Sequence, residues 1–165
     1  MSSLNITTAN DPDLAEFLSH NGFCDEDAAC LIALHPLISP LLPALSEAFY
    51  ERILASDAMR PFVIDKVDKV DHQHIGEVHL KQKIPPLFVS ASMAFLRAEM
   101  PKMLSPEVLG KLPLQHDYAF CTSALLRLID ICQFLIDRTY YRSLMELLGI
   151  SPKLFLRLMT SAAAK

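Results

Sequence analysis

The stretch that decides the fold is AFCTSALLRLIDICQFLI, residues 119–136. Its polar members are Thr122, Ser123, Arg127, Asp130 and Gln133. The other positions place apolar side chains on nearly every face of a helix, which is typical of a helix that is buried all round. Two environments of this helix are consistent with the pattern. The helix lies in the core of its own domain, or it packs on its domain on one side and on a partner chain on the other.

The residues around this stretch extend the predicted helix from Leu114 to Leu148, where Gly149 favours a left-handed C-cap. Elsewhere, acidic N-caps, prolines and apolar positions at helical spacing predict further helices. Their expected ranges are 11–21, 25–35, 39–55, 65–81, 86–104 and a short last helix from residue 152, with a turn or short helix at 105–107. The sequence contains no alternating strand pattern. We therefore expect an all-α protein with a single domain over residues 1–165.

The composition limits the class of protein. Apolar residues make up 52% and charged residues 21% of the 165 positions, which excludes a disordered chain. The net charge of −4 offers no positive field to nucleic acid, and four glycines are too few for a Gly-rich nucleotide loop. The four cysteines form no CxxC pair and no export signal is recognisable, so a cytoplasmic location is expected. No apolar run reaches membrane-spanning length, so the surplus of apolar surface requires a large core, an apolar ligand or a partner chain.

A histidine-rich stretch, DHQHIGEVH at residues 71–79, is the first candidate for chemistry. On a helix, His72 and His79 share a face but lie about 10 Å apart along the axis, and His74 points to another side. These three side chains are therefore a poor site for one metal ion. His79 alone is either a partly buried histidine or the single axial ligand of a haem iron.

Two motifs resemble the globin-coupled sensors, a family of haem-based oxygen sensors. HIGEVH at 74–79, followed by Ile84–Pro85 and an amphipathic helix, is similar to the region that carries the family's proximal histidine. EAFYERIL at 47–54 is similar to the family's FYxxI/L motif, whose tyrosine enters the distal pocket. The resemblance implies a globin-like sensor fold with a short extra N-terminal helix and a long C-terminal helix.

The resemblance also implies a set of site residues. His79 would bind the iron of haem b, and Tyr50 would donate a hydrogen bond to oxygen bound on the other side. Lys83 would meet a haem propionate. The expected walls of the haem pocket are Phe49, Phe62, Ile75, Val78, Ile84 and Phe88.

The chain departs from the family between these motifs. Tyr50 and His79 are 29 positions apart, and the ends of their own helices occupy much of that interval. An average helix of about 11–12 residues does not fit in what remains. Helix E, which covers the distal side of the haem in globins, is therefore expected to be missing or short, and the distal pocket to be open.

The function that the resemblance implies is a haem-based sensor of O₂, or of CO or NO, without enzymatic activity. Signalling would pass through a homodimer built on the long C-terminal helix to an output module that follows in a longer chain. The residues expected at the dimer contact are Leu125, Leu128, Cys132 and Leu135. The alternative is a haem-free globin-like domain that binds an apolar ligand or a partner protein. Neither hypothesis involves nucleic acid or a membrane.

Overall fold

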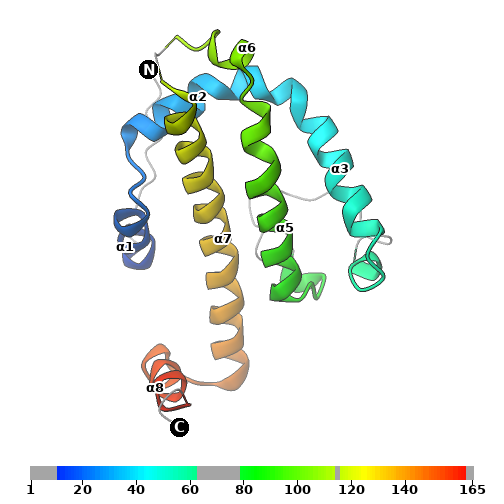
Figure 1. The fold of residues 1–165 in the computed structure, drawn as a ribbon. Helices are drawn as coiled ribbons and strands as arrows, with labels where there is room; N and C mark the ends of the chain where they lie inside the picture. Colours follow the sequence, from blue (N-terminus) through cyan, green and yellow to red (C-terminus); the bar gives the residue numbers. More distant parts are fainter. Residues whose placement is uncertain (1–10, 63–78, 114–115, 163–165) are drawn as a thin grey trace.

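The computed structural model describes residues 11–62, 79–113 and 116–162, and it contains helices and no strand over those ranges (Figure 1). The all-α prediction is confirmed. The longest element is helix α7, Tyr118–Leu148. It begins later than predicted because Asp117 is extended (φ −77°, ψ 170°) and its carboxylate accepts a hydrogen bond from the Phe120 N–H at 2.7 Å. Gly149 ends the helix in the predicted left-handed conformation, with φ 63°.

Two helices joined by a short turn lie across α7 and then run beside α5 (Figure 1). They are α2, Asp25–Ile38, and α3, Leu42–Leu54, and the 3-10 turn η1, Ser39–Leu41, connects them. The prediction that the first of these helices stops at residue 35 is wrong, because Pro36 lies inside α2.

The helix continues past Pro36 at the cost of one backbone hydrogen bond, since proline has no N–H. The Ser39 hydroxyl donates to the His35 carbonyl oxygen at 2.6 Å just beyond that point. Pro40 then falls in η1 and Pro43 in the first turn of α3, where a missing N–H costs least. The three prolines therefore bend this helical stretch without ending it.

The remaining elements lie close to their predicted positions. The prediction for residues 86–104 differs in that its last turn is 3-10 rather than α-helical. Residues 63–78, which include most of the helix predicted at 65–81, lie outside the described ranges, and residues 79–81 are helical. The elements are α1 Pro12–Asn21, η2 Arg60–Phe62, α5 Pro86–Glu99, η4 Met100–Met103, α6 Pro106–Leu109 and α8 Pro152–Ala162.

The core consists of two clusters along α7. The first lies between α2 and α7 and contains Cys30, Leu34, Ile38, Leu104, Cys121, Ala124 and Leu125. The second lies between α5 and α7 and contains Val89, Met93, Ile129 and Ile136. Leu125 is only 2% exposed, so the chain itself covers this expected dimer residue, whereas Leu128 is 37% exposed. The structure thus covers much of the apolar stretch 119–136 without a partner.

Ion pairs attach the N-terminal helices to α7. Asp27 of α2 is completely buried, and both of its carboxylate oxygens accept hydrogen bonds from Nη1 of Arg127 at 2.9 Å. Arg138 donates to Asp11, the N-cap of α1, at 2.7 Å. Burial would raise the pKa of Asp11, but its hydrogen bonds and the charge of Arg138 lower that pKa from its ordinary value.

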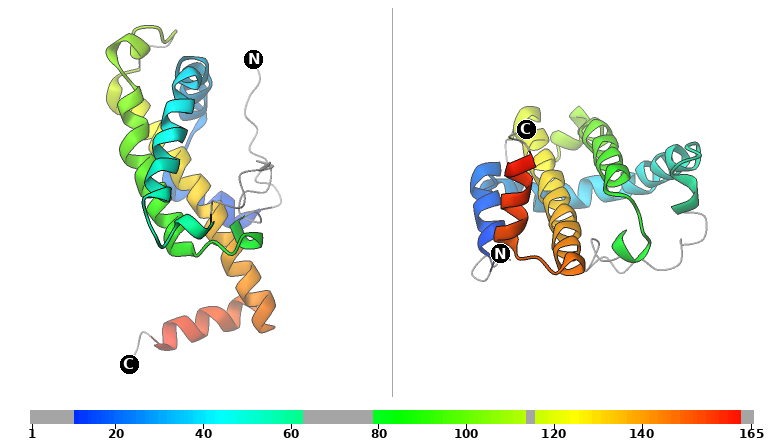
Figure 2. Two further views of the ribbon diagram at one scale, coloured as in Figure 1. Left: turned by 90° about the vertical axis from the view of Figure 1, so that its right-hand side faces the viewer. Right: turned by 90° about the horizontal axis from the view of Figure 1, so that it is seen from below.

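Helix α8 projects from the C-terminal end of α7 at a steep angle (Figure 2). Its ring contact with α7 is between Phe155 and Tyr141, whose centroids are 5.9 Å apart. Large apolar side chains are exposed at this end of the molecule: Leu144, Leu147, Leu148, Leu154, Leu156, Leu158 and Met159.

Two helical stretches, Asp25–Leu54 and Tyr118–Leu148, are long and apolar enough to cross a membrane. A core helix of a soluble protein passes the same test, and α7 contributes to both core clusters. The absence of a membrane span and the cytoplasmic location therefore remain predictions.

Candidate functional site

The FYxxI motif lies on α3, facing α5 and solvent. Phe49 is half-buried, and its ring lies 5.7 Å from that of Phe95 on α5. Tyr50 is 40% exposed and meets Phe49 edge-on at 5.6 Å. Arg52 lies over the outer part of this cluster, with its guanidinium 5.7 Å from the centre of the Phe95 ring. Phe95 and Arg52 were not among the predicted site residues, although Phe95 follows Phe88 by two helical turns on α5 and so shares its face.

A small cavity of about 80 Å³ lies between α3 and α5. It is lined by Phe49, Arg52, Ile53, Met59, Ala91, Ser92 and Phe95. Tyr50 is not in its lining, because that side chain is directed toward the solvent-exposed side of α3. The volume is well below the roughly 300–1,000 Å³ that ligand and cofactor pockets occupy.

His79 lies in a helical turn that leads into α5, and it is half-buried. Its carbonyl oxygen accepts a hydrogen bond from the Ile84 N–H at 3.0 Å. The chain reverses at Lys83, whose φ of 55° is in the left-handed region that a lysine rarely adopts. Lys83 is exposed, as its predicted contact with a propionate requires, and Pro85 then caps α5.

A hydrogen bond ties this turn to α7. The Tyr140 hydroxyl donates to the Ile84 carbonyl oxygen, and the half-buried Ile84 side chain packs against the core between α5 and α7. Burial and the nearby Asp137 carboxylate raise the pKa of Tyr140, so its hydroxyl remains a donor at neutral pH. Tyr140 was not singled out from the sequence, since a tyrosine on a long helix carries no signal for a partner 56 positions away.

The structure brings together some of the predicted residues. Phe62, at the end of η2, meets Phe88, in the first turn of α5, edge-on at 5.6 Å. This contact joins the segment that follows the Tyr50 helix to the segment that follows His79. Ile75 and Val78, two predicted walls, lie outside those residues.

The described side chains include the chemical groups that a haem site needs, but the cavity between α3 and α5 is too small for a haem. An imidazole, a phenol, a lysine and several apolar rings are the groups that a haem site uses. The exposed faces of Tyr50 and Leu54 on α3, and of Leu87 on α5, offer apolar surface for a macrocycle. The 80 Å³ cavity does not hold one.

A much larger hollow lies on another side of α7, between this helix and α1. This α1–α7 groove has a volume of about 860 Å³. Phe17 of α1 stacks on Phe134 of α7 inside it, with ring centroids 4.3 Å apart. A third hollow, of about 390 Å³, lies beside Leu80, Tyr140 and Leu144. The sequence does not predict the groove, because its walls come from helices more than 100 residues apart.

Comparison with known proteins identifies no relative: no protein-family model matches the chain, and no curated protein matches it. The resemblance to globin-coupled sensors therefore rests on the two motifs alone.

Proposed function

We propose that this chain is a haem-based gas-sensor domain of the globin type, with His79 as the iron ligand and Tyr50 on the gas-binding side. The observation that carries the proposal is the contact between Phe62 and Phe88, because it holds the two motif-bearing segments against each other. The apolar rings next to both motifs are the kind of surface that a macrocycle covers. Haem, when bound, supplies reversible binding of O₂, CO or NO.

The chain's own residues would orient and shield the cofactor. The hydrogen bond from Ile84 to the His79 carbonyl and that from Tyr140 to the Ile84 carbonyl fix the backbone that presents the imidazole. The exposed Tyr50 hydroxyl is a donor for the partial negative charge of a bound gas. Lys83, exposed at the reversal, would pair with a carboxylate at the edge of the group.

The proposed route of the signal starts at the hydrogen bond from the Tyr140 hydroxyl to the Ile84 carbonyl oxygen. Tyr140 lies on α7, so a shift of the His79 turn is transmitted directly to the long helix. A homodimer contact on the exposed part of α7, around Leu128, would pass this shift to a second chain and to an output module.

An absorption spectrum tests the proposal. We expect protein that is purified with haem supplied to show a Soret band, and His79→Ala to lose or change it. His35→Ala, which alters an exposed histidine of α2, is the matched control and should keep the band. In loaded protein, Tyr50→Phe should release O₂ faster. A protein that stays colourless after haem reconstitution would contradict the proposal.

One observation favours a second candidate, a haem-free domain of the same shape that binds an apolar ligand. The cavity beside Phe49 has a volume of about 80 Å³, whereas the α1–α7 groove has a volume of about 860 Å³. A colourless protein that nevertheless gains thermal stability from small apolar compounds would support this candidate.

A further inference from the structure

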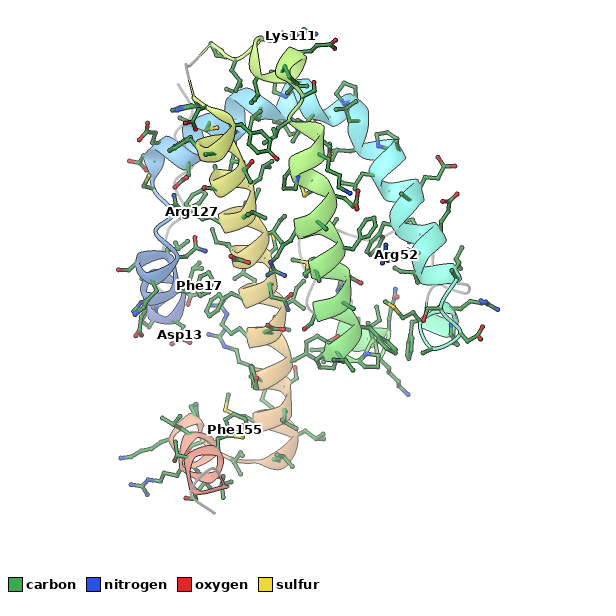
Figure 3. All side chains as sticks on the ribbon, in the orientation of Figure 1. Asp13, Phe17, Arg52, Lys111, Arg127 and Phe155 are labelled. Carbon is green, nitrogen blue, oxygen red and sulfur yellow. The ribbon has the colours of Figure 1, made fainter. Side chains whose placement is uncertain are left out.

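The α1–α7 groove has the dimensions and walls of a ligand site separate from the His79 region. Its volume of about 860 Å³ falls within the roughly 300–1,000 Å³ of small-molecule pockets. Helix α1 forms one wall, α7 forms the other, and Pro152 at the start of α8 lies at one end. Phe17, on the side of α1 that faces α7, is visible in Figure 3.

Aromatic side chains line the apolar part of the groove. The Phe17 and Phe134 rings are stacked at an interplanar angle of 15°, and the Arg138 guanidinium lies 5.3 Å from the centre of the Phe134 ring. Tyr141, two turns further along α7, is 52% exposed. An exposed ring of this kind can accept a second ring or a cation on its face.

The arginines of the groove already have acidic partners. Arg97 contacts Asp130 at 2.6 Å, and Arg142 contacts Asp13 at 3.5 Å. Arg138 is paired with Asp11, just outside the groove. A ligand therefore finds no guanidinium without a carboxylate, and the groove gives no preference to an anionic ligand.

Asp137 differs from the other carboxylates. It is half-buried, and it lines both the groove and the hollow beside Leu80 and Tyr140. It accepts a hydrogen bond from the Gln133 amide at 2.9 Å. No ion pair joins it to a basic side chain within residues 11–62, 79–113 and 116–162. A half-buried carboxylate that has only an amide donor is stabilised by a cation that binds next to it.

Two amide oxygens of the lining also require donors. Gln133 Oε1 and Asn21 Oδ1 are buried and have no hydrogen-bond partner in the described part of the chain. Because both atoms are closed off from the groove, a ligand that lies in the groove does not reach them, and they do not contribute to a ligand site.

We propose that the α1–α7 groove binds a protonated primary amine attached to an aromatic or similarly apolar body. An ammonium group has three donors and no acceptor, which suits the Asp137 carboxylate. The apolar body packs along Phe17, Phe134 and Tyr141. The site goes beyond the proposed haem function and does not depend on it.

Titration calorimetry with 2-phenylethylamine tests the site. We expect the amine to bind, and 3-phenylpropionate, which has a similar body and the opposite charge, to bind at least about tenfold more weakly. The same result is expected with and without added haem, so a failure of the haem proposal leaves this test intact. Equal binding of the amine and the acid, or no binding of the amine, overturns the proposal.

Variants locate the binding site. Asp137→Asn should weaken amine binding by about tenfold or more, since it removes the charge that the ammonium contacts. Glu146→Gln removes one acidic charge from the same helix outside the groove and should leave affinity unchanged. Met145→Lys places a cation within the groove and should also weaken binding, which provides a second test if Asp137→Asn folds poorly. If Asp137→Asn and Met145→Lys both retain full affinity, the amine binds elsewhere and the assignment is wrong.

Discussion

At the scale of single residues, the Asp27–Arg127 pair is the strongest polar contact between α2 and α7. Asp27 is fully buried, whereas the Arg127 side chain is 34% exposed. We expect Arg127→Met to destabilise the protein by about 3 kcal/mol, because it leaves a buried carboxylate without a counter-ion. Asp27→Asn should cost less, since the remaining guanidinium reaches water. Urea denaturation of both variants measures the difference, and the reverse order would contradict this explanation.

The cysteines differ in their environments, and so should their reactivity. Cys30 and Cys121 are fully buried with their Sγ atoms 3.6 Å apart, and burial together with the neighbouring Cys121 raises the pKa of Cys30 to about 12. Cys24 is exposed. We expect N-ethylmaleimide to modify Cys24 quickly in the folded protein, Cys132 slowly, and the buried pair only after denaturation. Peptide mass spectrometry identifies the labelled sites, and early labelling of Cys30 would contradict the packing of α2 on α7.

At the scale of elements, the attachment of α1 to α7 should depend on pH. Burial alone would raise the pKa of Asp11 above its ordinary 3.8. The hydrogen bond from Arg138 is the largest of the opposing effects, and together these effects lower the pKa in the folded protein. A lowered pKa contributes stability that is present above pH 3.8 and is lost as the pH falls through the folded-state value. We expect amide exchange in α1, corrected for its intrinsic pH dependence, to rise relative to α7 below that pH. Asp11→Asn should remove most of this dependence, and an unchanged dependence would exclude Asp11 as its cause.

Gly149 sets the end of α7 and the direction of α8. Its φ of 63° is one that an alanine adopts only with strain, although an added Cβ would meet no atom within 4 Å. Gly149→Ala should therefore lower the unfolding free energy by about 1 kcal/mol through the backbone alone. Glu146→Ala, in the last turn of the same helix, is the control and should change it little. Thermal and urea unfolding measure both, and equal stability of the Gly149→Ala protein would indicate that the helix end relaxes.

At the scale of the whole molecule, the proposed homodimer requires an exposed apolar contact on α7. Leu128 is 37% exposed, whereas Leu125 is buried in the chain's own core. We expect Leu128→Glu to convert a dimer to a monomer in light-scattering measurements, without a large loss of stability. Leu87→Glu, at a 75% exposed position on α5, should leave the mass unchanged. A dimer that survives Leu128→Glu would place the contact elsewhere, for example among the exposed leucines near α8.

The candidate site could be predicted only in part. The sequence correctly placed Tyr50 on a helix and a chain break at Ile84–Pro85 ahead of helix α5. The roles of Tyr50, His79 and Lys83 in a site stay predictions. The partners Phe95 and Tyr140 escaped prediction, because sequence spacing gives no information on which side chains of other helices they meet. The predicted ends of helices were wrong where two effects compete. At Pro36, the packing of α2 outweighs the loss of one backbone hydrogen bond, so the helix continues.

The sequence alone determined that this protein is helical, that the stretch 119–136 contributes to the core, and that a left-handed glycine ends the long helix. These are local properties, which follow from side-chain periodicity and backbone preference. The tertiary structure decided which helices pack against α7, that the cavity beside Phe49 is small, and that Asp137 lines a large groove between α1 and α7. Those properties depend on how distant helices pack together, and the hydrophobic effect that drives this packing is non-directional, so periodicity alone does not specify it.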